Sequence, residues 1–407
     1  MSFISRDLRS IIVVLLLLCT RSFAQISTSP YSAYGIGTLR ERTSAMNRAM
    51  GGTGIAVRDP LNLSNLNPAS YTSIQQATQL TEFGLFVESD RYANKNQNTS
   101  SKTGSITNLN IWLRFHKRWA GTVGANPLST VKYNIATNQT AGDNSALQYS
   151  GNGGITQFYF GNAFMVTKNL SVGVTGSFLH GSIDRLETIT TGFASGTQLS
   201  TLTYVNQGNL DFGAQYTFLF GEDKSLTIGA VYDNRLRLNT HRVTTVYQRT
   251  DTIASDKVKI NDYVLPEKGG SGISFQTAQH VFTADVTYQK WSKAHLDDDL
   301  KLRDTRRASV GYQFRGSPRS PFWNGFVLRA GGYLQENPLI LQNTSFRDWG
   351  ATVGIGLPVS NKRNTLNLSY SYNRSGTLER NLITQQSHIF TLDITFRDLW
   401  GIKRKFD

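Results

Sequence analysis

Apolar and polar residues alternate with a period of two along much of the chain. In the stretch L366-N-L-S-Y-S-Y372, the leucines and tyrosines fall on one face of an extended backbone, and the asparagine and serines fall on the other. The same rhythm returns in L210-D-F-G-A-Q-Y-T-F218, L226-T-I-G-A-V-Y232 and F390-T-L-D-I-T-F396. The pattern predicts β-strands that each have one apolar face and one polar face.

The alternation predicts about fourteen strands. They are expected near residues 77–91, 103–117, 119–136, 152–167, 169–185, 201–219, 224–248, 257–276, 279–291, 301–315, 324–336, 346–360, 363–376 and 385–400. Short and long connections alternate between them, with tight turns such as Lys117-Arg118 and longer polar loops such as residues 93–100. Such segregation is typical of outer-membrane barrels, and an even strand number places both termini on the periplasmic side.

The predicted fold class is therefore all-β, a transmembrane antiparallel β-barrel whose apolar face contacts lipid and whose polar face lines the lumen. A membrane β-structure must pair its backbone groups through neighbouring strands, so the sheet is expected to close on itself. Aromatic residues near the strand ends are expected to form girdles at the membrane interfaces. These residues are Trp112, Tyr133, Tyr216, Phe218, Trp291, Trp349 and Trp400.

The first 24 residues have the pattern of a secretory signal peptide. Arginines precede an apolar run at residues 11–18, and Ser22-Phe23-Ala24 supplies small residues for cleavage. The mature chain is then expected to begin at Gln25. The one cysteine, Cys19, falls inside this leader, and a lipoprotein anchor there would need a small residue in place of Leu18. The mature chain is thus expected to contain neither disulfides nor thiolate metal sites.

The chain is basic, with a formal net charge of +14. In an exported protein this balance favours contact with anionic outer-membrane lipid and lipopolysaccharide over nucleic acid. The six histidines are scattered, and neither an H-E-x-x-H nor a phosphate-binding G-x-x-x-x-G-K-[ST] motif is present. We therefore expect no enzymatic activity, no catalytic residues, no metal site and no cofactor.

One stretch before the first predicted strand does not alternate. It reads G51-G-T-G-I-A-V-R-D-P-L-N-L-S-N-L-N-P-A-S70. Its glycines permit positive-φ backbone, and Pro68 cannot donate a hydrogen bond to a strand ladder. Such backbone is tolerated at membrane depth only where protein or a water-filled lumen surrounds it. The chain is thus expected to divide into a signal peptide at 1–24, a hatch inside the lumen at 25–76 and a barrel at 77–407.

This stretch resembles the FadL/TodX family of outer-membrane transporters for hydrophobic compounds. The matching residues are M46-N-R-A-M-G-G-T-G-I-A-V-R-D-P60, N67-P-A69 and T81-E-F-G-L-F-V87. In that family a glycine-containing segment leads to an aspartate and then to Asn-Pro-Ala, and the segment folds inside the barrel as a hatch. The resemblance implies a hatch site, which either gates the lumen or simply fills it. Its residues would be Gly51, Gly52, Gly54, Asp59, Asn67, Pro68 and Ala69.

Two functions remain open at this stage. The family resemblance implies a channel in the outer membrane of a Gram-negative bacterium for passive uptake of hydrophobic small molecules, such as long-chain fatty acids. The start S29-P-Y-S-A-Y-G-I-G-T-L39 instead resembles a branch of largely unassigned function, and PorV-like relatives take part in type IX secretion. The alternative is therefore a non-transport barrel that is a subunit or shuttle of an outer-membrane secretion or assembly complex.

Overall fold

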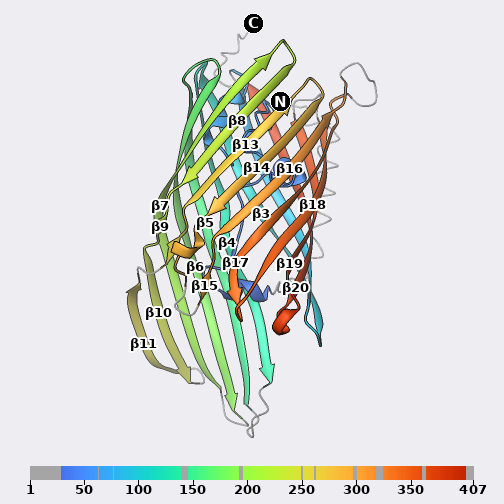
Figure 1. The fold of residues 1–407 in the computed structure, drawn as a ribbon. Helices are drawn as coiled ribbons and strands as arrows, with labels where there is room; N and C mark the ends of the chain where they lie inside the picture. Colours follow the sequence, from blue (N-terminus) through green and yellow to red (C-terminus); the bar gives the residue numbers. More distant parts are fainter. Residues whose placement is uncertain are drawn as a thin grey trace, which may run out of the picture.

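The computed structural model describes residues 29–399 apart from 63, 77, 139–144, 192–195, 249–250, 261–262, 297–299, 318–323 and 360–363. The predicted leader therefore lies outside the described residues. The main feature is a closed antiparallel barrel of fourteen strands, which confirms the predicted fold class (Figure 1). Strand β2 (Thr78–Ala93) pairs along its length with β20 (Thr384–Leu399), and this pairing closes the ring.

The other wall strands follow one another in chain order. The first half of the wall adds β3 (Asn98–His116), β4 (Trp119–Asn138), β5 (Ser145–Met165), β6 (Leu170–Thr191), β7 (Thr197–Phe220) and β8 (Lys224–Asp233). The second half adds β13 (Lys268–Gln276), β14 (His280–Gln289), β16 (Thr305–Arg315), β17 (Val327–Leu341), β18 (Thr344–Val359) and β19 (Asn364–Gly376). Most of these strands lie within a few residues of a predicted one, whereas β8 and β13 each cover only part of the predicted 224–248 and 257–276.

Short elements complete the described chain. The minor strands are β1 (Thr38–Leu39), β9 (Leu236–Arg237), β10 (Thr240–Gln248), β11 (Asp251–Ile260), β12 (Val264–Leu265) and β15 (Lys301–Leu302). The helical turns are η1 (Pro30–Ala33), α2 (Ala45–Ala49), η2 (Pro68–Ser73), η3 (Trp291–Lys293) and η4 (Glu379–Asn381). Among the described residues, no helix combines the length and apolar character that a membrane crossing requires.

The barrel has its polar face inside and its apolar face outside. In β19, Leu368 is 39% exposed, whereas Asn367 is 1% and Ser369 is 4% exposed. The same inversion holds in β20, where Phe390 is exposed and Thr391 is buried. A soluble sheet would bury the leucines, so this polarity fits a wall that contacts lipid.

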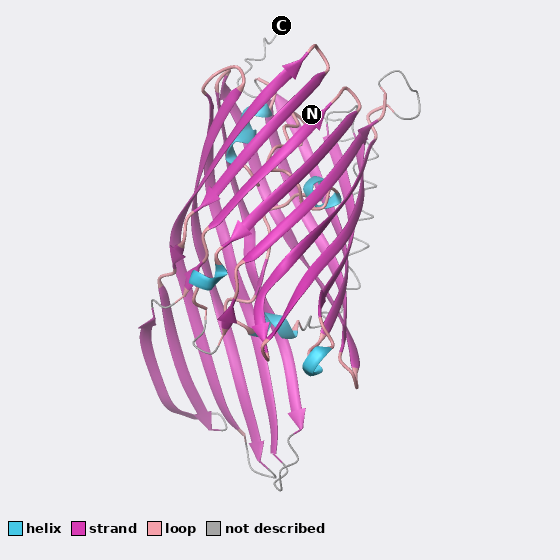
Figure 2. Cartoon of the chain, viewed as in Figure 1, coloured by secondary structure: helices cyan, strands magenta, loops and turns pink. Residues whose placement is uncertain are grey.

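The wall is not equally tall around the ring. Strands β4 to β7 have 20 to 24 residues, whereas β14 has 10 and β16 has 11. Figure 2 shows the long strands extending beyond the others at the end opposite the start of β2. One side of the barrel therefore carries a sheet that projects past the rest of the wall.

Two predicted strands, 224–248 and 257–276, are broken in the structure. The half of β7 at Asp211–Phe220 pairs with β8, and the half at Thr197–Val205 pairs with β10. Between β8 and β10 the chain leaves the wall, because Leu236 and Leu238 turn into a buried apolar cluster. The β10–β11 hairpin consequently extends the tall sheet and not the closed ring.

The predicted aromatic girdle is correct only in part. Tyr216, Phe218 and Trp349 are exposed on the outer face. Trp112 and Trp291 are buried, and so is Tyr133. Trp112 and Tyr133 lie at inward-facing positions of β3 and β4, and Trp291 lies in the turn η3. Other side chains inside the barrel cover all three. Trp400 lies outside the described residues.

Candidate functional site

Residues 29–76, called here the N-terminal segment, pack against the inward-facing side of the wall. Helix α2 contacts β17 to β20, and η2 contacts β3 to β7. The residues that connect α2 to η2 reach the strands in between. The segment therefore meets most of the ring, and this contact is the candidate functional site.

Glycines in the wall allow the N-terminal segment to approach closely. At each of these positions an added Cβ would come within 3.0 Å of an atom of the segment. The pairs are Gly161 with Tyr71, Gly173 with Pro68, Gly213 with Asn67, Gly229 with Ile55, Gly311 and Gly331 with Met50, and Gly354 with Ala49. Because side chains are missing at these inward positions, backbone or side-chain atoms of the segment lie directly on backbone of the wall.

The predicted glycine run turns sharply and is hydrogen-bonded to the wall. Gly51 and Gly52 have φ angles of +70° and +80°, which L-residues with a side chain rarely adopt. The N–H of Gly51 donates to Oγ1 of Thr352 at 2.9 Å, and its carbonyl accepts a bond from Arg307 at 3.0 Å. The run is therefore a bonded corner against β16 and β18.

Two buried carboxylates of the wall accept backbone hydrogen bonds from the N-terminal segment. Oδ2 of Asp285 on β14 accepts from the N–H of Gly54 at 2.7 Å and from that of Ile55 at 3.0 Å. Oδ2 of Asp393 on β20 accepts from the N–H of Ala45, the first residue of α2. Two carboxyl groups on different strands thus hold backbone of the N-terminal segment directly.

Asn67, Pro68 and Ala69 form the start of η2, and all are buried. Oδ1 of Asn67 caps this turn by accepting from the N–H of Ala69 at 3.0 Å, and Pro68 occupies the first position, where no N–H is needed. Nδ2 of Asn67 donates to the carbonyl of Ile55 at 2.8 Å, and also to the carbonyls of Ala214 at 3.2 Å and Ala230 at 3.3 Å. The tripeptide thus joins the N-terminal segment to β7 and β8.

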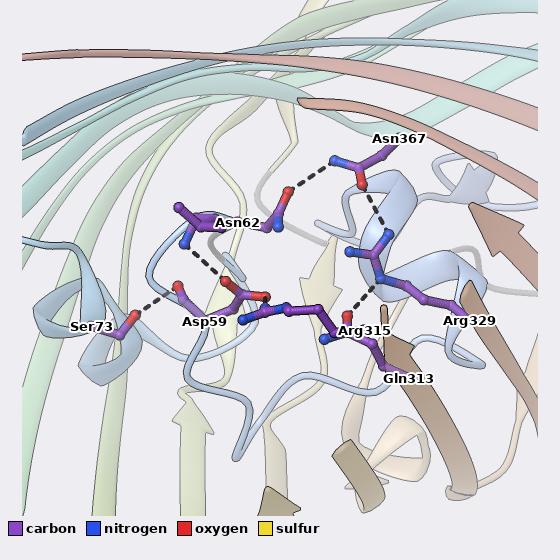
Figure 3. Close-up of polar contacts among 8 residues, drawn as sticks. Asp59, Asn62, Ser73, Gln313, Arg315, Arg329 and Asn367 are labelled. Carbon is purple, nitrogen blue, oxygen red and sulfur yellow. Dashed lines mark hydrogen bonds and ion pairs between the residues drawn. The ribbon is translucent and has the colours of Figure 1, made fainter. Parts of the chain in front are cut away.

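Asp59 is buried and lies in an ion pair with the wall (Figure 3). Its Oδ2 is 3.0 Å from Nη2 of Arg315 on β16. Its Oδ1 accepts from the N–H of Leu61 at 2.8 Å, and its carbonyl accepts from the hydroxyl of Ser73 at 3.1 Å. Asp59 therefore fixes the turn that follows it as well as the distance to β16.

A separate polar chain lies near this ion pair (Figure 3). Arg329 donates through Nε to Oε1 of Gln313 at 2.7 Å and through Nη1 to Oδ1 of Asn367 at 2.9 Å. Nδ2 of Asn367 then donates to Oδ1 of Asn62 at 2.9 Å. β16, β17 and β19 are thus connected to the N-terminal segment through side chains alone.

Arginines of the N-terminal segment form further attachments that sequence reasoning missed. Arg42 pairs with Asp211 on β7 at 2.5 Å, and Arg40 pairs with Glu88 on β2 at 2.9 Å. Arg58 donates to Oε1 of Gln215 at 2.8 Å. The sequence signal that could have indicated these attachments is an acidic residue on the polar face of a predicted membrane strand. Such a charge needs a partner inside the lumen.

The start of the N-terminal segment is pinned near the other end of the lumen. The hydroxyl of Tyr31 donates to the carbonyl of Ile383 at 2.5 Å, and that of Ser32 donates to the carbonyl of Lys132 at 3.0 Å. Burial, together with the nearby charge of Asp348, raises the pKa of Tyr31 to about 12. The S29-P-Y-S stretch is thus tied to both β4 and the residues before β20.

The apolar cluster occupies the lumen beside this tail. It joins Ile36 of the N-terminal segment to inward-facing wall residues such as Ile155 and Val205 and to the loop residues Leu238 and Trp291. All five are at most 3% exposed. Side chains of the protein itself therefore fill this part of the lumen.

Cavities between exposed side chains lie on the outer side of the described wall. One of about 910 Å³ is bordered by exposed phenylalanines of β5, β6 and β7, including Phe158, Phe178 and Phe212. Another, of about 550 Å³, lies between Val87, Val353 and the strands next to them. Their exposed apolar borders face the lipid side of the wall.

Comparison with known proteins identifies one matching family model and a set of solved structures with a similar fold. The BamG family model matches residues 7–407. A search of curated proteins finds no sequence match. The family label differs from the FadL/TodX resemblance of residues 46–87.

Solved structures with a similar fold include channels and transporters of aromatic hydrocarbons. The CymD monoaromatic hydrocarbon channel has 16% sequence identity and a TM-score of 0.62, with 88% of this chain and 98% of that chain covered. The Ralstonia pickettii toluene transporter TbuX has 16% identity and a TM-score of 0.59, with 87% and 98% covered. The Pseudomonas putida toluene transporter TodX has 15% identity and a TM-score of 0.62, with 88% and 98% covered. At these identities the likeness is one of fold.

Proposed function

The chain belongs to the BamG family, and from that starting point we propose that it is an outer-membrane barrel with a fixed internal hatch, which serves as a subunit of an outer-membrane secretion or assembly complex. The observation that carries the proposal is the attachment of the N-terminal segment to the wall. Thr352, Asp285 and Asp393 accept backbone N–H groups of the segment. Asn67 of the segment donates to wall carbonyls. These attachments lie on well-separated strands and favour a static hatch.

The energetic cost of moving such a hatch is high. Each buried hydrogen bond contributes about 1 kcal/mol net, and those to charged groups contribute about 1.5–3 kcal/mol. Releasing the N-terminal segment from Asp285, Asp393, Thr352 and Arg315 would cost on the order of 10 kcal/mol. A ligand can shift this equilibrium only by its difference in affinity between the two states. At about 25 cal/mol per Å², roughly 400 Å² of newly buried apolar ligand surface would be needed.

The tall sheet supports a role in contacts with other proteins. Strands β4 to β7 and the β10–β11 hairpin extend past the rest of the wall (Figure 2). Residues of this extension such as Asn134, Gln148 and Asp184 are polar. A sheet that extends beyond the lipid offers a surface for contacts with other proteins. Transport through the lumen would not require such a surface.

Passive uptake of hydrophobic small molecules is the second candidate. It is favoured by the likeness in fold to the CymD hydrocarbon channel and the toluene transporters TbuX and TodX. An apolar ligand would enter from the long loops, reach a pocket between the wall and the hatch, and leave after a hatch movement. The filled apolar cluster at Ile36 and Leu238 weighs against an open pocket at that position.

The remaining features of the proposal concern orientation and surroundings. We place both termini on the periplasmic side, because β2 begins and β20 ends at the same end of the barrel. The exposed apolar belt would contact outer-membrane lipid, and basic residues near the opposite end would contact lipopolysaccharide. Neither proposed function includes enzymatic chemistry.

Affinity purification of the tagged protein from native membranes tests the proposal. A subunit is expected to bring down another protein in stoichiometric amount after solubilisation in mild detergent. A monomer that carries bound lipid or hydrocarbon, together with lost uptake on gene deletion, would sink the proposal and support the transporter. A barrel of unrelated sequence, tagged and purified in the same way, controls for adventitious recovery.

A further inference from the structure

Strand β11 is a free edge of the projecting sheet. β10 pairs with β7 on one side and with β11 on the other. Within the described part of the chain, the strand register pairs β11 with β10 alone. Nine of its ten residues are exposed, and Figure 1 shows it at the outer margin of the molecule.

The barrel does not need β11 for closure. The ring passes from β7 to β8 and then to β13, so the hydrogen bonds of the lipid-facing wall are complete without the β10–β11 hairpin. An edge strand presents a row of unpaired N–H and C=O groups, which is a template for another strand. The hairpin therefore carries an available pairing edge outside the closed wall.

The charged side chains of β11 weigh against lipid as the occupant of this edge, although Ile253 and Val258 are also exposed. Asp251, Asp256, Lys257 and Lys259 are all exposed. Charged residues on a lipid-facing strand are costly at membrane depth. The hairpin also pairs with the half of β7 remote from β8, so it lies outside the strands that close the wall. The edge thus faces water.

A register shift divides β11 into two unequal parts. Val246 pairs with Ala254 and Tyr247 with Thr252, so Ile253 is bulged. From Ala254 to Ile260 the pairing with β10 is regular. This regular part is long enough to accept a strand of several residues.

The regular part is basic on one face. Ser255, Lys257 and Lys259 share a face because they alternate along the strand, and Lys259 pairs across with His241 of β10. Asp256 and Val258 lie on the other face. A complementary strand would therefore present acidic residues two positions apart opposite Lys257 and Lys259, because opposite charges across a ladder are stabilising.

We propose that β11 is a docking edge for an acidic, extended segment of another protein, which adds as an antiparallel strand to Ala254–Ile260. The proposal rests on the proposed role as a complex subunit and names the surface that the partner uses. Main-chain hydrogen bonds would supply affinity, and the alternating side chains would supply specificity.

A second copy of the chain is a poorer occupant. Two barrels inserted in one membrane are related by rotation about the membrane normal, so their β11 strands run in the same sense along it. They could therefore pair only in parallel, which is the less stable arrangement. An extended segment of a different protein is free to run antiparallel.

Photo-crosslinking in native membranes tests the proposal on the full-length protein. A photoreactive amino acid is placed at Ser255 or Lys257, and in a control at Val310, an exposed position of the lipid-facing wall. We expect an adduct with one other protein from the two β11 positions and not from Val310. Absence of any adduct, or an adduct with the size of two copies of this chain, would overturn the proposal.

Charge reversal tests the acidic character of the partner. Lys257→Glu combined with Lys259→Glu should lower adduct yield from Ser255 by about tenfold, because two attractive cross-strand pairs become repulsive. The exposed Lys301→Glu on β15 is the matched control and should leave the yield unchanged. An undiminished yield in the double variant contradicts an acidic partner.

The two proposals fail in different ways. If affinity purification recovers a stoichiometric partner but β11 forms no adduct, the subunit role stands. The proposal that β11 is the docking edge is then wrong. Recovery of the barrel without any partner removes the subunit role. Heat-dependent gel migration of each variant shows whether its barrel is folded.

Discussion

Oδ2 of Asp285 lies 2.7 Å from the backbone nitrogen of Gly54, although the two residues are 231 positions apart in the chain. The same oxygen accepts from the N–H of Ile55. One wall carboxylate thus holds the corner of the N-terminal segment that follows the glycine run. The strength of such attachments decides whether the N-terminal segment stays fixed against the wall or moves.

Replacing Asp285 should loosen this corner. We expect Asp285→Ala to lower the free energy of unfolding by about 1–3 kcal/mol, because two buried N–H groups lose their acceptor. The temperature at which the barrel loses its folded gel migration measures the change. Asp256→Ala, on the exposed strand β11, is the control and should shift this temperature little. Equal shifts in the two variants would show that Asp285 does not hold the segment.

The inward glycines give a test with a matched control on one strand. A Cβ at Gly213 would overlap Asn67, whereas a Cβ at Gly208 would meet no atom closer than 4.0 Å. Gly213→Ala should therefore displace η2 and cost about 1–3 kcal/mol, and Gly208→Ala should be nearly neutral. Trypsin cleavage at Arg58 in purified protein reports the displacement. Unchanged cleavage in Gly213→Ala would contradict close packing at this point.

The ion pair between Arg42 and Asp211 should behave as a buried pair. Removing either partner leaves an uncompensated charge, so Arg42→Ala and Asp211→Ala should each cost about 3–5 kcal/mol. The double variant should cost less than the sum of the two. The exposed pair Lys290–Glu267 is the contrast, and Lys290→Ala should cost at most about 1 kcal/mol. Additive losses in the first pair would show that the two residues do not interact.

A disulfide between the N-terminal segment and the wall separates the two candidate functions. Oγ1 of Thr72 on η2 lies 2.8 Å from Oγ of Ser171 on β6, and the chain has one cysteine, Cys19, in the predicted leader. Thr72→Cys with Ser171→Cys should therefore crosslink under oxidation and leave partner recovery unchanged. The two single variants are the controls. Loss of hydrocarbon uptake in the oxidised double variant alone would instead identify a hatch that moves.

The positions of the wall strands were predictable because their sequence signal is local. Alternation in a stretch such as 366–372 specifies both a strand and its lipid-facing side without knowledge of any neighbour. The break at Leu236 and Leu238 was not predictable in this way. Their burial depends on loop residues such as Trp291, and a period-two pattern continues through them unchanged.

The sequence by itself determined that the chain is a barrel with an irregular glycine-rich segment before its first strand, because both signals are contained in neighbouring residues. Only the tertiary structure decided what that segment touches. Asp59 faces Arg315 and Asn67 faces Gly213 because the N-terminal segment runs around the inside of the closed ring. Its path brings each residue beside a strand that is distant in the sequence. Such pairings depend on strand register and on the path of the segment around the ring, and no local pattern encodes either.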